Sequence, residues 1–364
     1  MPEEHRRMSL SPAPPPPLPS GKHGARGRAA LVDDVRFDAH RSTGYHPERP
    51  ERLLAARRAI DASAVDWARI AARPASDDEL ARAHDPRFID ELEKLRGQTV
   101  HLDPDTYVAP DSIDAARLAA GGLVALVDAV IDGPDAKGVA LLRPPGHHAR
   151  PAHAMGFCLF NNVAVAAAHA RARGVERVLI VDWDVHHGNG TQAMFWDEPA
   201  VLYVSTHQSP FYPGTGAGDE VGGFGARGLT VNVPLPPGTT GNVVRRALDE
   251  VAAPVIDAFG PTWVLVSAGF DAHRADPLAD LSLSSGDFAD LARTVSAYAP
   301  QPGRVAVFLE GGYDLEALRS SVAATLGALT GVSEVPGIEP PTAGGNGVEA
   351  VIAAAAARAR ALGG

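Results

Sequence analysis

The sequence predicts an α/β protein whose mostly parallel central sheet is covered by helices on both faces. Short apolar segments rich in β-branched residues alternate with segments of helical pattern through most of the chain. Such alternation is typical of parallel sheets, because a helix usually forms the crossover between parallel strands. The 364 residues and the 45% hydrophobic content allow a large core. No internal repeat and no second domain is visible, so we expect a single three-layer α/β/α domain.

The predicted elements follow from the apolar period and from the turn residues between segments. Strands are expected at residues 29–37, 138–142, 177–181, 200–206, 229–233, 263–267 and 304–309. Helices are expected at residues 76–82, 86–96, 111–131, 161–173, 241–259, 286–298, 315–329 and 348–362, and two more begin near Glu51 and at Thr191. The polar loop at residues 38–50 holds His40 and His46, which could approach a site but are interpreted as solvated.

The chain divides into three predicted parts. Residues 1–28 are basic and proline-rich, cannot bury a core, and are predicted to form a disordered tail. Residues 29–331 contain all the predicted strands and form the folded domain. Residues 332–364 are a linker followed by an alanine-rich terminal helix.

The composition argues against several functional classes. The formal net charge of −11 argues against binding of nucleic acid through a basic face. The single cysteine, Cys158, excludes an intrachain disulfide. Neither an apolar run of about 18 residues nor a secretory signal is visible, so we expect a cytoplasmic protein without a membrane segment. The alanine- and arginine-rich, lysine-poor composition is typical of a bacterial gene of high GC content.

The segment at residues 178–192, VLIVDWDVHHGNGTQ, gives the strongest functional signal. Its first residues form a buried strand, after which Asp182, Asp184 and His186 alternate with apolar residues. Side chains two residues apart in an extended chain point to the same side, so these three share one face. Two carboxylates and an imidazole leaving a buried strand are costly unless a cation compensates them, which favours a divalent metal site. The alternative is a set of helix caps, but a cap needs one such residue and not three.

Polar side chains also follow three other predicted strands at the point where each strand ends. The tandem pair His147 and His148 follows one strand, Asp271 follows another, and Tyr313 follows the last. Each residue alone could be a turn or cap residue. Because ligands bind at the carboxyl ends of the strands in such sheets, the combination predicts a functional site at this edge.

Three of these residues form a plausible metal ligand set. Asp184, His186 and Asp271 offer two oxygens and one nitrogen and leave a position open, which is the pattern of catalytic zinc. An oxygen-rich set of this kind also accepts iron(II), so the ligand types leave the metal open. Asp182 could orient a histidine or hold a monovalent cation.

The tandem histidines are candidates for proton transfer. If Asp182 and Asn189 accept hydrogen bonds from them, the two rings differ in protonation, because a carboxylate favours the imidazolium more than an amide does. One of the pair, His147 or His148, could then take a proton from water and return it to a leaving amine. Tyr313, which follows two glycines, could donate to a developing oxyanion, although a packed aromatic is the alternative interpretation.

Five motifs carry a resemblance to a known family. The segments RPPGHHA, MGFCLFNN, DWDVHHGNGTQ, AGFDAH and EGGYD, in this order, resemble the histone deacetylase and acetylpolyamine amidohydrolase family, and its class II branch in particular. The resemblance runs from about residue 33 to residue 331. It implies an arginase-like fold, a zinc ion, and hydrolysis of an N-acyl amide on a cationic side chain or a polyamine.

The resemblance also implies roles for individual residues. The zinc ligands would be Asp184, His186 and Asp271, and the catalytic set would be His147, His148, Tyr313, Asp182 and Asn189, with His148 as the general base and acid. A structural potassium ion would lie at Asp182, Asp184, His186, Ser205 and Thr206. The acyl-lysine channel would be lined by Gly156, Phe157, Tyr212 and Leu278, where Tyr212 replaces the phenylalanine usual in the family.

The substrate prediction depends on Leu278. This residue stands where the polyamine-selective branch carries an acidic gatekeeper, so the chain is more similar to bacterial lysine deacylases of class II type. The expected substrate is an acyl-lysine peptide or protein, or a small acylated amine. Acetylpolyamine hydrolysis is the first alternative, an arginase-type binuclear manganese hydrolase the second, and a non-catalytic ligand-sensing or scaffold protein the third. The acyl length and the oligomeric state stay open.

Overall fold

The computed structural model describes residues 27–300, 304–332 and 337–363. The predicted disordered tail at residues 1–28 lies outside the described residues except for its last two, and so does part of the predicted linker, residues 333–336. The C-terminal helix is present as α11 (Val348–Leu362).

The centre of the molecule is an eight-stranded sheet in which every neighbouring pair of strands is parallel. Its strands are β1 (Arg28–Asp33), β2 (Asp66–Ile70), β5 (Lys137–Leu141), β6 (Val178–Asp182), β7 (Val201–Gln208), β8 (Thr230–Leu235), β9 (Trp263–Ala268) and β10 (Val305–Leu309). Their order across the sheet is β2-β1-β5-β10-β9-β6-β7-β8. The parallel sheet predicted from the alternating pattern is therefore confirmed.

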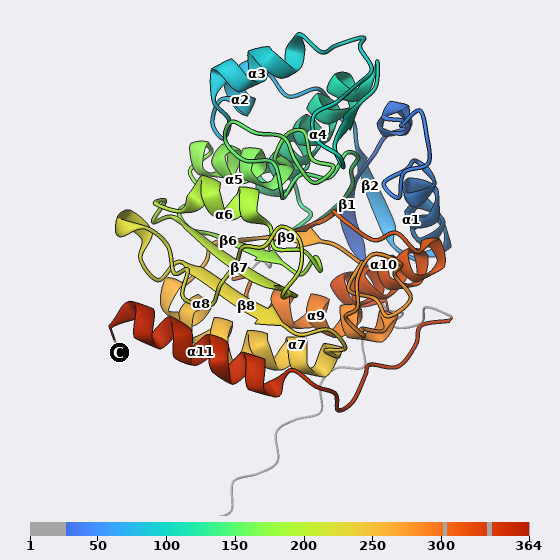
Figure 1. Cartoon of the computed structure of the whole chain (residues 1–364). Coiled ribbons are helices and arrows are strands. Elements are labelled where there is room, and N and C mark those ends of the chain that lie inside the picture. Colours follow the sequence, from blue (N-terminus) through green and yellow to red (C-terminus); the bar gives the residue numbers. More distant parts are fainter. Residues whose placement is uncertain (1–26, 301–303, 333–336, 364) are drawn as a thin grey trace, which may run out of the picture.

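Helices cover both faces of this sheet (Figure 1). On one side lie α4 (Ser112–Asp132), α5 (Asn162–Ala172) and α6 (Asn189–Phe195), with the short α2 (Asp77–Leu80) and α3 (Pro86–Glu93) outside them. On the other side lie α1 (Glu51–Ala62), α7 (Gly241–Ala247), α8 (Ala253–Phe259), α9 (Ser285–Ala297) and α10 (Leu315–Thr330), and α11 packs beside α7 and β8. The three-layer prediction is confirmed. Within the part of the chain that the structure describes, no helix has the length and apolar character to cross a membrane.

The central strands are apolar along nearly their whole length because both of their faces are covered. Every residue of β6 and of β9 is buried, and these strands lie side by side in the middle of the sheet. The largest cluster of buried hydrophobic residues includes both strands and the helices on either side. The core therefore fixes the register at which the ends of β6 and β9 meet.

The first strand is shorter than predicted. It was expected at residues 29–37, but β1 ends at Asp33 and a short 3-10 helix, Val35–Ala39, follows. The side chain of Asp34 accepts a hydrogen bond from the Arg36 main-chain N–H and caps this helix. Such local side-chain bonds compete with strand pairing, which is why the strand stops here.

Three further features differ from the sequence prediction. Strand β2 was not predicted, because its residues at the sheet edge are exposed or half-buried and lack an apolar run. The small antiparallel ladder of β3 (Val100–His101) and β4 (Tyr107–Val108) lies between two predicted helices, where no strand was predicted. The helix predicted at residues 241–259 contains a π-helical segment between α7 and α8, just before Pro254, which cannot donate a helical hydrogen bond.

The interpretation of His40 as a solvated residue is wrong. Its ring is buried, stacks on Tyr107 at 4.3 Å between centroids, and places Nδ1 2.7 Å from the Ser112 hydroxyl. Burial lowers the pKa of His40 to about 3, so the ring is neutral. It packs under the loop at residues 41–50 as a structural residue. His46 is half-buried and its ring lies against Tyr107 and Phe157.

A pair of leucine substitutions tests the location of the core. Leu265 in β9 is fully buried, so Leu265→Ala should lower the free energy of unfolding by about 2–5 kcal/mol. Leu54 in α1 is 48% exposed, so Leu54→Ala makes the same chemical change and should cost at most about 1 kcal/mol. Urea unfolding followed by circular dichroism measures both values. Equal losses would contradict this assignment of the core.

Candidate active site

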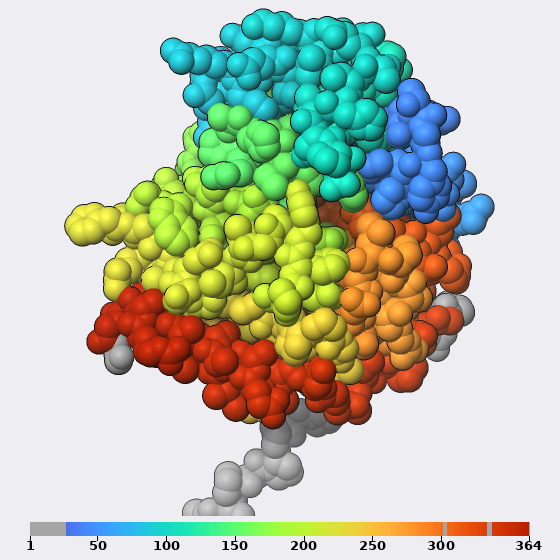
Figure 2. Space-filling model, viewed as in Figure 1, coloured from blue at the N-terminus to red at the C-terminus, as the bar shows by residue number. Residues whose placement is uncertain are grey.

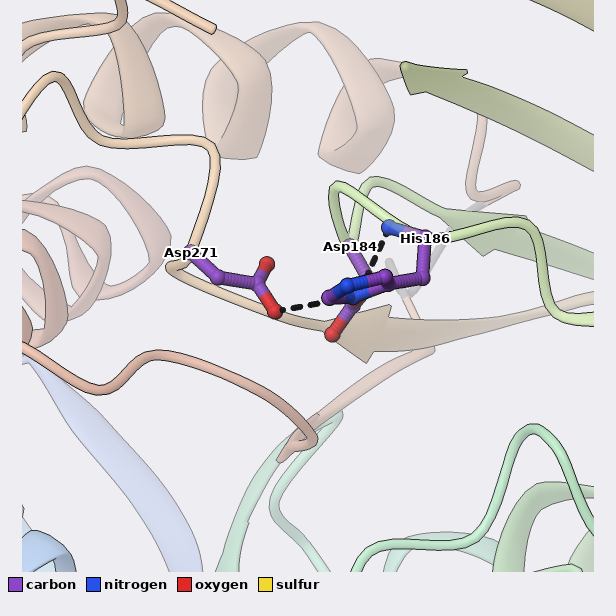
Figure 3. Close-up of side chains that lie close together, drawn as sticks. All are labelled: Asp184, His186 and Asp271. Carbon is purple, nitrogen blue, oxygen red and sulfur yellow. Dashed lines mark hydrogen bonds and ion pairs between the residues drawn. The ribbon is translucent and has the colours of Figure 1, made fainter. Parts of the chain in front are cut away.

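The loops after β6 and β9 bring three ligating side chains together, Asp184, His186 and Asp271 (Figure 3). One ligand atom from each of Asp184, His186 and Asp271 lies within 4.8 Å of the other two. The Nδ1 atom of His186 is 3.0 Å from Oδ1 of Asp184 and 3.3 Å from Oδ2 of Asp271. The sequence placed these residues at strand ends, and the structure brings all three together.

Main-chain N–H groups hold the two carboxylates in place. The Val185 N–H donates to Oδ1 of Asp271 at 2.9 Å, and the Gly311 N–H donates to Oδ2 of Asp184 at 2.9 Å. Glycine is required at two nearby positions, because a Cβ atom would lie 2.0 Å from Asp184 Oδ2 if added at Gly269 and 2.0 Å from Asp271 Oδ2 if added at Gly311. The backbone therefore closes around the carboxylates without room for side chains.

The donor set fits a divalent cation. Asp184 and Asp271 are both at most 1% exposed, and burial together with the Asp184 charge raises the pKa of Asp271. Oδ2 of Asp271 is buried and, among the described residues, receives no hydrogen bond; its nearest approach is the ion pair with His186. Two buried carboxylates side by side are costly without a positive charge between them. Two oxygens and one nitrogen with an open side match the ligands of catalytic zinc.

The tandem histidines have the two predicted partners. Nδ1 of His147 lies 3.0 Å from Oδ2 of Asp182, and Nδ1 of His148 lies 2.8 Å from Oδ1 of Asn189. Burial would lower the pKa of His147, but the carboxylates of Asp182 and Asp184 raise it well above the ordinary value. Burial and the charge of His147 lower the pKa of His148 well below the ordinary value. His148 is therefore the neutral ring of the pair.

The orientation of the Asn189 amide decides which nitrogen of His148 is free. The amide NH2 donates to Sδ of Met155 at 3.4 Å, so the amide oxygen faces Nδ1 of His148. That oxygen can only accept, so Nδ1 carries the proton and donates it. The Nε2 atom of His148 is left with a lone pair, as a proton acceptor needs.

A cavity of about 200 Å³ opens above these groups. Its walls include the predicted channel residues Gly156, Phe157, Tyr212 and Leu278, together with His147, His148, His186 and Tyr313. Gly156 is required here, because a Cβ atom at this position would lie 2.5 Å from the His148 ring. Phe157 adopts φ 69°, a left-handed backbone that side chains rarely take, and such strain clusters at functional sites. The cavity is narrow and largely apolar, as an alkyl chain would require.

Tyr313 lies in the cavity wall with its hydroxyl protonated. Its ring packs edge-on against Phe157 at 5.9 Å between centroids, and the guanidinium of Arg52 lies 4.9 Å from the ring centre. Burial raises the pKa of the Tyr313 hydroxyl well above its ordinary value, so the group remains a donor. A fixed neutral donor beside the ligand triad is suited to stabilising negative charge on a bound oxygen.

The two side chains of the predicted potassium site that the hydrogen bonds describe, Asp182 and Ser205, have partners of their own. Asp182 and Ser205 are partners across β6 and β7. However, Oδ2 of Asp182 lies beside His147 and accepts from the Tyr203 hydroxyl at 3.2 Å, while the Ser205 hydroxyl lies 2.9 Å from Nδ1 of His207. The potassium site stays a prediction.

Sequence reasoning missed two groups around the cavity. Asp105 lies in the cavity wall, but it comes from a loop and not from a strand end, so the strand-end pattern could not find it. Arg52, fully buried, donates to the main-chain carbonyls of Glu310 and Gly312 beside Tyr313. Nothing local in its helix distinguishes Arg52 from the other arginines of the sequence.

Comparison with known proteins identifies the family. Residues 46–329 match the family described as "Histone deacetylase domain". The chain belongs to the histone deacetylase family. It is therefore a hydrolase of the deacetylase class, which acts on amides.

Individual members of the family are similar over most of the chain. "Histone deacetylase 10, chloroplastic" of Oryza sativa subsp. japonica is 39% identical over 345 residues, which are 86% of this chain and 78% of that protein. "Polyamine deacetylase HDAC10" of Homo sapiens is 41% identical over 338 residues, which are 86% of this chain but 49% of that protein. A structure described as "Crystal Structure of HDA15 HD domain" has a TM-score of 0.84 and 37% identity, covering 93% of this chain and 97% of that one. The arginase-like fold is thereby confirmed.

Removal of one carboxylate tests the metal site. We expect the protein to bind a stoichiometric divalent ion and Asp271→Asn to lose it, because an amide is a weaker ligand and leaves one negative charge fewer. Asp257→Asn makes the same change at an exposed position in α8 and should keep the ion. Elemental analysis after dialysis against zinc measures the content. Full occupancy in Asp271→Asn would contradict this ligand set.

Proposed function

We propose that the protein is a zinc-dependent amidohydrolase that removes acyl groups, acetyl among them, from Nε-acyl-lysine. One observation carries the proposal: His186 of the ligand triad, the neutral ring of His148 and Tyr313 line the same largely apolar cavity. These are the parts that amide hydrolysis needs, namely a metal ligand set, a proton acceptor and an oxyanion donor. Membership of the histone deacetylase family supports the same reaction class.

The metal chemistry would be supplied at Asp184, His186 and Asp271. A zinc ion held there provides a Lewis acid that polarises the acyl carbonyl and makes water more acidic. Iron(II) suits the same ligands, and elemental analysis distinguishes the two. Among the described residues these three form the single group with metal-ligand spacing, which favours one metal and disfavours the binuclear manganese alternative.

The side chains around the cavity account for the remaining steps. Phe157 and Tyr212 hold the alkyl stem of the substrate between them and exclude water. Nε2 of His148 accepts a proton from the attacking water and later gives it to the departing amine. Tyr313 donates its hydroxyl hydrogen to the oxygen of the acyl carbonyl as negative charge develops there. Asp182 favours the protonated form of His147, which adds positive charge next to the metal ligands.

The role of Tyr313 is testable by removing one oxygen atom. Tyr313→Phe should lower kcat roughly 100- to 1000-fold, because it deletes a donor to the developing oxyanion. The metal content should not change, because the hydroxyl is not among the ligands. Tyr298→Phe removes the same atom at the end of α9, away from the cavity, and should leave kcat unaltered. Turnover of an acetyl-lysine peptide measures both variants; a Tyr313→Phe enzyme with near-normal kcat refutes the assignment.

Acetylpolyamine hydrolysis is the second candidate. It is favoured by the similarity to the human protein named polyamine deacetylase and by the Asp105 carboxylate in the cavity wall. Leu278 in the cavity wall favours lysine, because a leucine cannot pair with the second ammonium of a polyamine. We therefore expect a higher kcat/KM for an acetyl-lysine peptide than for acetylputrescine.

Leu278→Glu tests this selectivity. A carboxylate at the cavity wall should raise the kcat/KM for acetylputrescine relative to acetyl-lysine by about tenfold, the effect of a favourable charge pair of about 1.4 kcal/mol. Leu278→Gln has nearly the same shape without the charge and should not change the ratio. A parallel assay of both substrates with both variants gives the answer. An unchanged ratio in Leu278→Glu would mean that the second ammonium of the polyamine does not bind near residue 278.

A protein that senses or binds an acylated amine without cleaving it is the third alternative. Binding without cleavage would not require a neutral histidine and a tyrosine in the same cavity wall as a metal ligand. If the zinc-loaded protein cleaves none of a panel of lysines with acetyl to long acyl groups, nor acetylputrescine, the hydrolytic proposal fails.

A further inference from the structure

One buried carboxylate behind the cavity wall has no part in the chemistry described so far. Asp276 lies in the loop after β9 and is 7% exposed. Its Oδ2 atom accepts hydrogen bonds from the main-chain N–H of Tyr313 at 2.6 Å and of Asp314 at 3.2 Å. Its Oδ1 atom accepts from the main-chain N–H of Leu278 at 3.0 Å. A single side chain therefore collects three backbone donors from two loops.

The two loops joined by Asp276 form part of the cavity wall. Leu278 and Tyr313 both line the cavity, although they are separated by 35 positions in the chain and follow different strands. Asp276 is not itself among the lining residues, so it acts on substrate only through its neighbours. The Asp276 carboxylate is thus placed to set the distance between Tyr313, the proposed donor to the oxyanion, and Leu278 in the other loop.

Asp276 binds the nitrogen of Tyr313 itself, whereas Arg52 binds the carbonyls of Glu310 and Gly312 before it. Tyr313 is preceded by Gly311 and Gly312, and Gly312 has φ +115°. Neither glycine has a side chain that could hold this part of the loop in place. The Tyr313 ring also contacts Arg52 and Phe157. These ring contacts restrain the position of the side chain less than hydrogen bonds would. The bond from Asp276 acts directly on the Tyr313 backbone nitrogen, where the direction of the side chain is set.

Burying the Asp276 carboxylate is energetically unfavourable. Burial raises the pKa of Asp276 to about 7, with the charge of Asp271 adding to the rise, and the three N–H donors lower it only in part. No salt bridge of Asp276 occurs among the described residues. An apolar residue of similar size would avoid this cost, so the carboxylate is explained by what its hydrogen bonds hold.

We propose that Asp276 is a positioning residue that fixes the Tyr313 hydroxyl for oxyanion stabilisation and sets its spacing from Leu278. The inference rests on the proposed hydrolytic function and adds to it a residue that works from outside the cavity. Displacement of a donor by a fraction of an ångström weakens transition-state stabilisation steeply, whereas the ligand triad is held by other bonds. Loss of the anchor should thus affect turnover more than metal binding.

The first variant is Asp276→Asn. An amide has one acceptor oxygen in place of two, so at least one of the anchored loops loses its acceptor and meets an NH2 group. We expect kcat to fall by at least about tenfold, with metal content unchanged. The matched control is Asp85→Asn at the start of α3, where the carboxylate also accepts a main-chain N–H, that of Arg87 at 2.8 Å, and kcat should stay the same.

A double-mutant cycle with Tyr313→Phe separates positioning from general destabilisation. If Asp276 acts by placing the tyrosine hydroxyl, its substitution has little left to disturb once that hydroxyl is gone, so Asp276→Asn should cost less than about threefold in the Tyr313→Phe background. Independent effects multiply instead. A loss of equal size in both backgrounds overturns the proposal.

A second variant and a second measurement guard against misfolding. Asp276→Glu keeps the charge and both acceptor oxygens but moves them by one methylene, so it should fold and still lower kcat. Amide hydrogen exchange at Tyr313, read by NMR or mass spectrometry, should become faster in this variant than in the wild type. Unchanged exchange and unchanged kcat overturn the proposal.

The outcome also distinguishes this inference from the function on which it rests. A zinc-loaded wild-type protein that cleaves no acyl amide overturns both. An active wild type that depends on Tyr313 but shows multiplicative losses in the cycle overturns the role of Asp276 alone.

Discussion

The site depends on two carboxylates, Asp184 and Asp271, that are buried side by side where water cannot screen their repulsion. Main-chain N–H groups hold their oxygens in place, and glycines stand at positions 269 and 311 because a Cβ atom at either would clash with a carboxylate oxygen. A nearby imidazole, His186, completes the set. Such an arrangement is costly without positive charge between the carboxylates, and this cost is the physical reason for the cation site that we propose here.

The parallel sheet explains how residues so far apart in the chain reach this point. Strands β6, β9 and β10 are adjacent in the sheet and run in the same direction, so their carboxyl ends lie at one edge. The cost of burying polar groups at that edge is offset by a core in which β6 and β9 are completely buried. A rigid core therefore also fixes the positions of the reactive groups, because the loops that carry them continue directly from the buried strands.

A second layer of buried charge supports the cavity wall from behind. Arg52 donates to carbonyls on either side of Gly311, Asp276 accepts from the N–H of Tyr313, and the Glu310 carboxylate accepts from the Gly146 N–H at 2.7 Å in the loop of the tandem histidines. These groups bind main chain, so they fix loops that glycines and prolines would otherwise leave without side-chain restraint. In metal sites generally, groups outside the ligand set likewise orient the residues that bind the metal.

Apart from β2, β3 and β4, the sequence by itself predicted the alternation of strands and helices and the parallel sheet. It also predicted the candidate metal ligands and proton-transfer residues, because these predictions depend on local period and on which residues follow each strand. It also offered Asp182 and Asn189 as hydrogen-bond partners of the two histidines. Only the tertiary structure decided that β1 ends at Asp33, that Asp105 enters the cavity wall, and that Asp276 anchors a tyrosine 37 residues away. The physical reason is that a residue's neighbours in sequence set its backbone, whereas its burial and long-range partners are set by how the strands pack.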